Sequence, residues 1–311
     1  MPIWGVEAGC IASRQLRSSA LANRFASAQD LVPRAYVIAP LGANAITISS
    51  SFFDGPVSTD PTIPVTDFKA RFDIASFSYS RSLNFFGHSA NVVGSVPYGI
   101  GNFHGTVAGV PNHPYRSGLV DGRLRFSVNL RGGRAMHFNQ FAKWREKLVI
   151  GTSLTVLTPI GQYDPARLIN LGLNRWAFKP EVGASRRFGP WALDLYGGVW
   201  FFTANSAFFP GTSVRTQAPV GAGEMHLSYV ARPRLWASLD GNFWTGGRTT
   251  RNGTENIDYQ RNSRAGATVS VPLTRKQSLK FSYSRGAYIS IGGNYQNFSA
   301  AWQYSWLSTP R

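Results

Sequence analysis

The sequence predicts an all-β fold: a transmembrane, antiparallel, up-and-down β-barrel of about twelve strands. Two observations carry this prediction. Apolar and polar residues alternate over many segments of similar length. Short and long connections between these segments also alternate along the chain. The first pattern indicates strands with two different faces, and the second is typical of barrels that cross a bacterial outer membrane.

Alternation is clearest in residues 120–130, where Leu124 and Phe126 lie on one face and Arg123 and Arg125 on the other. Segments with this period are each about 11 residues long, the length that a tilted strand needs to cross a bilayer. The predicted strands are 43–53, 71–81, 88–98, 120–130, 148–158, 175–186, 191–203, 217–229, 234–245, 261–271, 277–288 and 295–306. Their even number is the one that single-chain bacterial barrels require.

The connections between these segments give a second test. Outer-membrane barrels have short periplasmic turns and long external loops. With the N-terminus in the periplasm, the periplasmic links 82–87, 187–190, 230–233 and 272–276 are short, whereas the external links 54–70, 99–119, 159–174, 204–216 and 246–260 are long. The periplasmic link 131–147 is an exception in length, and its residues 139–147 could form a short helix.

Aromatic residues gather near the predicted strand ends, as in the girdles that mark the two membrane interfaces. They are Phe52, Phe53, Tyr79, Tyr98, Trp176, Trp191, Phe201, Phe202, Tyr229, Phe243, Trp244, Tyr288 and Trp306. A soluble β-sandwich also alternates, with aromatic residues in its core. Strands of soluble sheets are usually only about 5–6 residues long, however, and this favours the membrane barrel.

Composition excludes several classes of protein. No run of 18 apolar residues is present, so a helical membrane span is excluded. Cys10 is the only cysteine, which rules out an intramolecular disulfide and a zinc motif. The net charge is +17, but the basic residues are scattered, so the expected partners are anionic lipid headgroups or anions in the lumen and not nucleic acid. We expect no cofactor, since Gly221-Ala-Gly223 lacks the strand-to-helix setting of a nucleotide motif.

Two regions are expected along the chain. Residues 29–311 form the outer-membrane barrel, and residues 1–28 do not share its strand pattern. The stretch Phe25-Ala-Ser-Ala28 has the form of a signal-peptidase site, but the apolar run of an export signal is missing. Residues 1–28 are therefore an N-terminal extension, or a degenerate export signal with a misassigned start.

Four stretches of the chain resemble the MetA-pathway phenol-degradation family of outer-membrane barrels. They are PRAYVIAPLGANAITISSSFFDG (33–55), TPIGQYDPARLINLGLNRWAFKPEVGASRRFG (158–189), GGVWFFTAN (197–205) and LDGNFWTGGRT (239–249). The resemblance covers residues 30–306, and the second stretch is the most specific. It implies a Gram-negative outer-membrane transporter linked to the catabolism of aromatic compounds such as phenol.

Charged residues that face inward are the main candidates for function. On the strand assignment they are Arg123, Arg125, Arg175, Lys179, Glu181, Glu224, His226, Arg264 and Lys280. Rings of basic side chains would favour anions, such as benzoate-like acids or phosphate, in a pore. Alternatively, these side chains form Arg–Glu pairs that only fill the interior of a narrow barrel. The sequence does not decide between the two.

The external loop 159–174 carries a second candidate. Tyr163, Asp164 and Arg167 begin its most specific stretch, and an Asp164–Arg167 pair could order the loop so that it folds in and narrows the pore.

Two further arrangements are weaker. Glu224, His226 and Ser228 share one strand face and could act as a hydrolase triad, but neighbours on one face lie about 7 Å apart along a strand. We therefore expect no enzymatic activity. His104 and His113 share an external loop and could bind a metal, but such a pair is more often solvated, and no metal site is expected.

The sequence thus predicts an outer-membrane channel for passive uptake of small molecules, of the aromatic or the anionic class. Its partners are outer-membrane lipids and a small solute. The alternatives are a plugged, non-conducting barrel with a structural or interaction role and, less favoured, an outer-membrane hydrolase.

Overall fold

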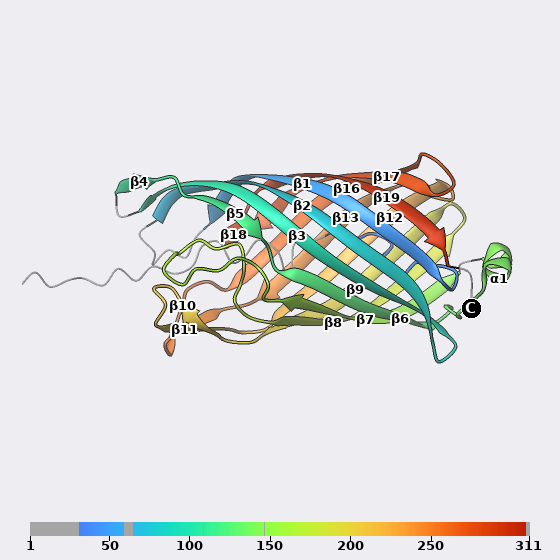
Figure 1. Ribbon diagram of the computed structural model, residues 1–311, viewed down its shortest axis with the longest axis horizontal. Helices are drawn as coiled ribbons and strands as arrows, with labels where there is room; N and C mark the ends of the chain where they lie inside the picture. The colour runs from blue at the N-terminus through green and yellow to red at the C-terminus, as the bar shows by residue number, and fades with distance from the viewer. Residues whose placement is uncertain (1–30, 59–64, 108, 146, 309–311) are drawn as a thin grey trace, which may run out of the picture.

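Twelve antiparallel strands form the wall of a closed barrel, so the predicted fold is confirmed (Figure 1). The computed structural model describes residues 31–58, 65–107, 109–145 and 147–308. In chain order, the wall strands are β1 (Ala43–Ser58), β2 (Val65–Phe85), β3 (His88–Val107), β6 (Gly122–Arg131), β7 (Leu148–Thr158), β8 (Ala177–Phe188), β9 (Trp191–Phe202), β12 (Val220–Arg232), β13 (Leu235–Gly246), β16 (Gln260–Pro272), β17 (Gln277–Ile289) and β19 (Gln296–Leu307).

The barrel closes because β1 pairs with β2 on one side and with β19, the last strand, on the other. The β1–β19 register runs without a shift from Ala43 opposite Leu307 to Asp54 opposite Gln296. Each remaining wall strand pairs with the wall strands before and after it in the chain. Closure leaves no strand edge whose backbone N–H and C=O groups would face lipid unpaired.

The outside of the wall is apolar. Leu239, Val182 and Leu124 are 68%, 60% and 52% exposed, and each sits at an alternate strand position. A continuous apolar surface of this kind is suited to lipid and not to water. Since successive strand residues point to opposite faces, the residues between them face the barrel interior.

Three residues expected in the aromatic girdles point inward instead. Phe53, Phe202 and Trp244 each directly follow another aromatic residue, and only the first member of each pair can face lipid. Trp244 is fully buried, whereas Phe243 beside it is 50% exposed. The girdle therefore contains fewer aromatic residues than predicted, and the barrel interior contains more of them.

The external end is more ordered than predicted. Links 54–70 and 99–119, expected as loops, largely continue as the long hairpin of β2 and β3, with β4 (Val110–Asn112) and β5 (Tyr115–Leu119) paired to β3 (Figure 1). The extension is stable because alternation continues: Phe68, Phe72 and Phe103 all bury their rings on the inner face.

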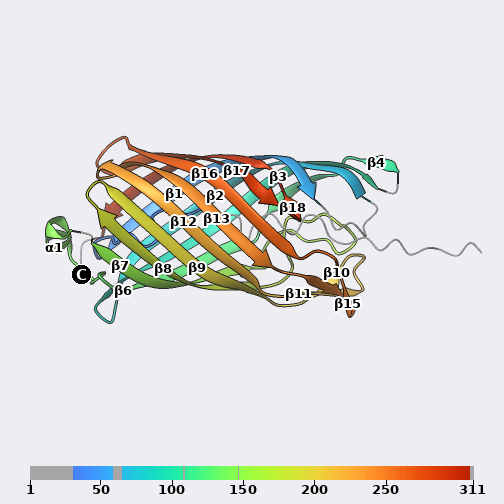
Figure 2. The ribbon, with the colours of Figure 1, turned by 180° about the vertical axis from the view of Figure 1, so that it is seen from behind.

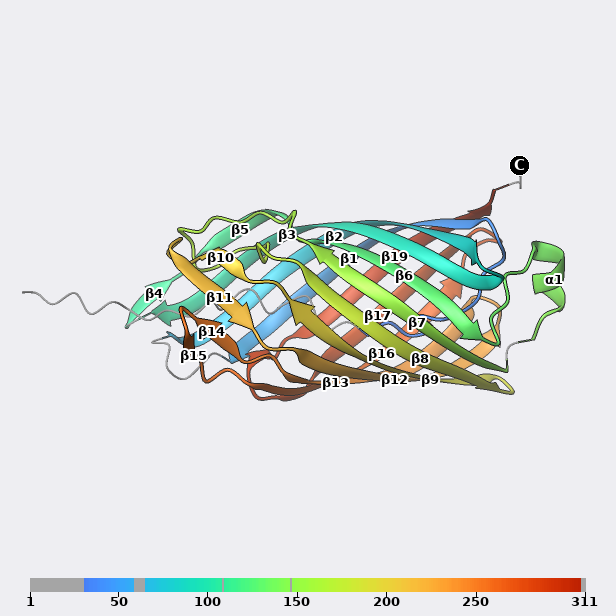
Figure 3. The same ribbon diagram turned by 90° about the horizontal axis from the view of Figure 1, so that it is seen from below.

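A second, four-stranded sheet lies at the same end (Figure 3). It consists of β10 (Asn205–Phe208), β11 (Ser213–Gln217), β14 (Thr249–Arg251) and β15 (Thr254–Glu255). The two-residue strand β18 (Gly292–Gly293) pairs with the external end of β1.

The opposite end carries the short turns and, by the usual orientation of such barrels, faces the periplasm. The long link 131–147 lies there and contains the six-residue helix α1 (Phe138–Lys143), close to the predicted helix (Figures 1 and 2). Among the described residues, no helix is long and apolar enough to cross a membrane.

The wall begins at Ala43, where the first predicted strand also starts. Residues 31–42, which we call the plug segment, run inside the barrel, where Tyr36 and Ile38 are each 2% exposed. The predicted extension, residues 1–28, lies outside the described residues.

The β1–β19 closure can be tested by cross-linking. Ser49 and Ala301 are direct partners across the closing pair, at a spacing that a disulfide can bridge. We expect Ser49→Cys with Ala301→Cys to form a disulfide on mild oxidation, seen as altered mobility of the heat-unfolded, unreduced chain. In the control, Ser49→Cys with Ala300→Cys, the second thiol faces lipid. Equal cross-linking of both pairs would contradict the register.

Candidate functional site

The interior of the barrel holds the charged residues predicted to line the lumen. Eight of the nine lie on inward positions of wall strands, as the alternation predicted: Arg123, Arg125, Lys179, Glu181, Glu224, His226, Arg264 and Lys280. Arg175 lies just before β8, where it is 4% exposed and donates to the side chain of Gln217.

Opposite charges are paired across neighbouring strands at mid-height. The Lys179 Nζ lies 2.7 Å from Glu181 Oε2 and 3.4 Å from Glu224 Oε1. Arg125 Nη2 lies 3.5 Å from Glu181 Oε1. All of these side chains are mostly buried, so each charge depends on its partners for stabilisation.

The band of polar residues continues onto β13 and β16 through His226 and Asp240. These two are direct partners across β12 and β13, and His226 Nδ1 lies 2.8 Å from Asp240 Oδ1. Asp240 also accepts hydrogen bonds from Ser238 at 2.8 Å and from Thr268 at 2.7 Å. Both carboxylate oxygens are thereby satisfied without water.

The side chains of Glu224 and His226 lie closer together than their backbone spacing. Their side chains lean toward each other, and His226 Nε2 lies 3.4 Å from Glu224 Oε2, because side-chain length bridges the spacing of the backbone. Ser228 does not join them: its buried Oγ has no hydrogen-bond partner among the described residues. The arrangement is a His–carboxylate cluster without an engaged nucleophile, so it does not form a hydrolase triad.

The plug segment docks on the carboxylates of this band. Three of its backbone N–H groups donate to wall side chains: Val32 to Glu224 at 3.4 Å, Arg34 to Asp194 at 3.1 Å, and Ala35 to the Tyr196 hydroxyl at 3.0 Å. Backbone donors that would otherwise lie unpaired inside the barrel thus find acceptors. In addition to accepting these hydrogen bonds, inward acids form ion pairs with Lys179 and His226.

Tyr36 anchors the plug segment in a slot in the wall. Its hydroxyl donates to Glu181 at 3.0 Å and lies 3.2 Å from Ser153 Oγ, and the Arg125 guanidinium lies 4.9 Å from its ring centre. Two glycines make room for the ring. A Cβ added at Gly151 or Gly183 would come within 2.4 or 2.2 Å of a Tyr36 ring carbon, closer than real contacts allow.

The long periplasmic link 131–147 packs against the periplasmic side of the plug segment. Ile38 and Tyr36 pack in an apolar cluster with Met136, and Phe141 and Trp144 lie against this cluster. The Leu41 N–H donates to the Met136 carbonyl at 2.8 Å. The exception in the predicted pattern of connections therefore has a structural role: it covers the periplasmic side of the plug segment.

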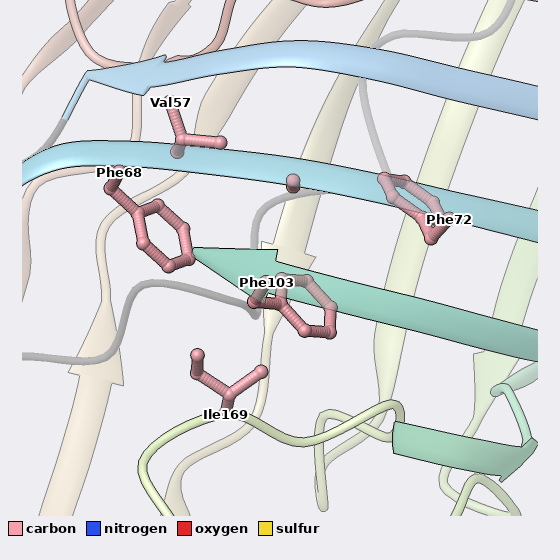
Figure 4. Packing of buried hydrophobic residues seen from close by; sticks show 6 residues of the cluster. Val57, Phe68, Phe72, Phe103 and Ile169 are labelled. Atoms are coloured by element: carbon pink, nitrogen blue, oxygen red, sulfur yellow. The ribbon is translucent and has the colours of Figure 1, made fainter. Parts of the chain in front are cut away.

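Above the polar band, the interior holds two apolar clusters beside buried polar side chains such as Arg264, Asn262 and Gln260. One cluster joins Val57, Phe68, Phe72 and Phe103 of β1–β3 to Ile169 of the external loop (Figure 4). A second cluster lies over β7–β9, β12 and β13; its members are Leu157, Leu173, Ala177, Trp200, Val220 and Trp244. Both clusters use residues from loop 159–174 as well as the wall.

Loop 159–174 is folded over these clusters and held at both of its ends by Asp121, which lies between β5 and β6. The Asp121 carboxylate accepts hydrogen bonds from Gly161 N at 3.0 Å and from Leu173 N at 2.8 Å. Arg116 adds a bond from its Nε to the Ile169 carbonyl at 2.8 Å.

The three loop residues singled out from the sequence lie in the same loop. Arg167 Nε is 2.9 Å from Asp164 Oδ2, and the Tyr163 hydroxyl donates to the Ala207 carbonyl at 3.0 Å. Asp164 and Arg167 are about half exposed, and such pairs contribute roughly 0–1 kcal/mol. The mostly buried Asn170 makes a larger contribution to loop order: it accepts from Asp164 N and donates to the Asp164 and Arg167 carbonyls.

The structure brings His104 and His113 together, with their Nδ1 atoms 2.7 Å apart on an exposed hairpin. Within the described residues, no group of three or more His, Cys, Asp or Glu side chains could hold a metal ion. The two rings hydrogen-bond to each other, as a solvated pair can.

Sequence reasoning missed Tyr36, Asp121, Asn170, Asp194 and Asp240. The three acids could have been found, because Asp121, Asp194 and Asp240 have the inward parity of their predicted strands. Tyr36 and Asn170 lie outside the predicted strands, where alternation gives no signal.

Comparison with known proteins places the chain among outer-membrane barrels. Residues 53–287 match the family model described as "Putative MetA-pathway of phenol degradation". The fold is similar to that of the COG4313 outer membrane channel from Pseudomonas putida F1, with 18% identity, 89% of this chain and 100% of that chain covered, and a TM-score of 0.77. The β domain of the Bordetella autotransporter BrkA shares 11% sequence identity with this chain. That match covers 85% of this chain and 100% of that chain, with a TM-score of 0.49. Among curated proteins, no sequence matches this chain.

We expect the docking of loop 159–174 to depend on pH through Asp121. Burial raises the pKa of this carboxyl from its ordinary value of 3.8 to about 6. The docked loop therefore binds a proton more tightly than the undocked loop, so docking gains stability as the pH falls through 6. Protease cleavage within 159–174 should slow between pH 7.5 and pH 5, and Asp121→Asn should abolish this dependence.

The matched control is Asp164→Asn, which alters an exposed carboxyl of the same loop and should keep the wild-type profile. A wild-type cleavage rate that rises as the pH falls, after correction for protease activity, would show that the sign is wrong.

Proposed function

Because the chain belongs to the MetA-pathway phenol-degradation family, we propose that this outer-membrane barrel is a channel for small apolar, aromatic molecules, closed at mid-height by its plug segment. Passage is passive and needs no cofactor. The wall supplies a path of suitable polarity, and the plug segment decides whether the path is open.

The observation that carries the proposal is an aromatic cluster on β1–β3 in the external half of the interior. Phe53, Phe68, Phe72 and Phe103 occupy inward positions, where a barrel that conducts hydrophilic solutes has polar side chains. Ligand sites for apolar molecules are lined by apolar and aromatic side chains with a few polar groups. In Figure 4, Phe68 and Phe103 come together with Val57 and Ile169. Loop 159–174 covers these rings, so a molecule arriving from outside has to displace the loop before it contacts them and reaches the polar band.

The balance of inward charge favours the aromatic over the anionic class. Away from the periplasmic strand ends, the described wall strands carry five inward basic residues, Arg123, Arg125, Lys179, Arg264 and Lys280, and four inward acids, Glu181, Asp194, Glu224 and Asp240. Lys179 and Arg125 already have carboxylate partners. A balanced set of pairs attracts anions far less than a ring of unpaired basic side chains.

Opening requires Tyr36 to leave its slot. The anchors of the plug segment are individual hydrogen bonds to Glu224, Asp194, Tyr196 and Glu181, with no covalent bond among them. Each such bond contributes about 0.5–1.5 kcal/mol, or somewhat more where the acceptor is charged. The plug segment can therefore be displaced without unfolding the wall, whose stability rests on the strand pairing.

A second candidate is a permanently closed barrel with a structural or interaction role. The cover that Phe141 and Trp144 place under the plug segment favours it. The two candidates differ in their response when Tyr36 is excluded from its slot: a gated channel conducts, and a closed barrel does not.

We expect Gly151→Ala and Gly183→Ala to open the channel. The added methyl group overlaps the Tyr36 ring, and losing a buried aromatic anchor costs about 3–5 kcal/mol. This corresponds to a shift on the order of a hundredfold or more toward the undocked plug segment. Planar-bilayer recordings should show larger or more frequent openings than in wild type. In cells with an intact outer membrane, uptake of neutral phenol should rise more than uptake of anionic benzoate.

The matched control is Gly197→Ala, an exposed glycine of β9 whose added Cβ meets no atom within 4 Å. It should leave conductance and uptake unchanged. If both slot variants fold, as judged by heat-modifiable gel mobility, and still do not conduct, the closed barrel is favoured. A larger gain for benzoate would favour the anionic class.

A further inference from the structure

The positive charge of the chain is concentrated at the periplasmic end of the barrel. Twelve basic residues lie there, at strand ends and in the links between strands: Arg81, Arg131, Arg134, Lys143, Arg145, Lys147, Arg186, Arg187, Arg232, Arg234, Arg275 and Lys276. We call this set the periplasmic rim. No described residue at this end is an Asp or Glu, and the sequence of its links contains only Glu146. Most of the rim side chains are exposed.

The other levels of the barrel show no such excess. The described external end carries ten basic residues and seven acids. The basic ones are Lys69, Arg71, Arg116, Arg167, Arg175, Arg215, Arg248, Arg251, Arg261 and Arg285, and the acids are Asp54, Asp67, Asp73, Asp121, Asp164, Glu255 and Asp258. The inward charges of the wall are nearly balanced. The rim is therefore a local feature and does not simply reflect a basic chain.

The rim borders the membrane. Arg186 is two residues from the lipid-facing Phe188, and Arg232 is three residues from the lipid-facing Tyr229. Tyr229 packs edge-to-face on Trp191, which is also exposed to lipid. Aromatic residues of this kind mark the interface between the acyl chains and the headgroups. The basic side chains next to them are at the depth of the phosphates.

One part of the rim is built from two neighbouring turns. Arg234, in the β12–β13 turn, donates to the carbonyls of Arg275 at 2.6 Å and of Thr274 and Lys276 at 3.4 Å, all in the β16–β17 turn. It also donates to Ser305 Oγ on β19. These bonds hold Arg232, Arg275 and Lys276 on adjacent turns without an acidic residue among them. Like charges held together in this way repel each other, and a bound anion relieves the repulsion.

We propose that the periplasmic rim binds the headgroups of anionic phospholipids in the inner leaflet of the outer membrane, with the cluster around Arg234 as its most ordered site. Arginine suits a phosphodiester, since its planar guanidinium can donate two parallel hydrogen bonds to phosphate oxygens. The rim residues come from β2, β6, β8, β12 and the links next to them, around much of the circumference. A shell of lipid matches this distribution better than a soluble acidic protein, which would cover one side of the barrel end. The proposal does not depend on whether the barrel conducts.

The test uses the full chain in nanodiscs that contain equal amounts of phosphatidylglycerol and phosphatidylethanolamine. Lipids that remain bound are counted by native mass spectrometry. We expect wild type to retain phosphatidylglycerol preferentially. The triple variant Arg232→Gln, Arg275→Gln, Lys276→Gln should lower this preference by at least about fivefold, the factor that one basic residue near an anionic surface carries. Arg234 is kept because it holds the two turns together.

The matched control removes the same number of charges from the external end: Lys69→Gln, Arg261→Gln and Arg285→Gln, all exposed. It should leave the preference unchanged, and heat-modifiable mobility verifies that both variants are folded. Equal losses in the two variants would mean that net charge and not the rim attracts the lipid. Absence of any preference in wild type would overturn the proposal and point to a soluble acidic partner for the rim.

Discussion

Everything in this structure depends on the closure of β1 on β19. Inside a bilayer no water can satisfy backbone N–H and C=O groups, so a strand can cross only if both of its edges are paired. The unshifted β1–β19 register meets this condition at the last seam of the wall. Once the sheet is closed, alternation gives each strand a lipid face and an interior face, and sequence can then vary on the interior face without disturbing the membrane face.

Closure also creates a packing problem, because the interior of a twelve-strand barrel is too wide for the wall's own side chains to fill everywhere. The chain solves it differently at each level. Near the outside, aromatic residues of the long β2–β3 hairpin meet loop 159–174. At mid-height, glycines at positions 151 and 183 leave a slot that is filled by Tyr36 from the plug segment. Below it, the link 131–147 covers the plug segment with Phe141 and Trp144. At each level part of the filling comes from outside the wall, namely loop 159–174, the plug segment and the link 131–147, and these parts can move while the wall stays paired.

Alternation allowed the sequence to predict the wall and the inward direction of Lys179, Glu181, Glu224 and His226, because a period of two is unaffected by errors of a residue or two at strand ends. The same rule missed the site's centre. Tyr36 precedes the first strand, and its slot is formed by the absence of side chains at two glycines on neighbouring strands, a feature that only strand register reveals. The contact between His226 and Glu224 was also missed, since backbone spacing says little about where the ends of long side chains meet.

Net charge alone does not show where in a barrel the basic residues lie. A value of +17 was compatible with an anion-attracting lumen or with anionic lipid. In the structure, the inward acidic side chains accept hydrogen bonds from other groups inside the barrel. Glu224 and Asp194 receive the plug segment's backbone donors, and Asp240 holds His226, so the inward basic residues are opposed by nearly as many carboxylates. An uncompensated ring of arginines there would leave the plug segment without acceptors. The excess of basic residues therefore has to lie elsewhere. The periplasmic rim, at the water boundary where exposed charges carry little desolvation cost, is the place where the chain can carry it without destabilising the barrel.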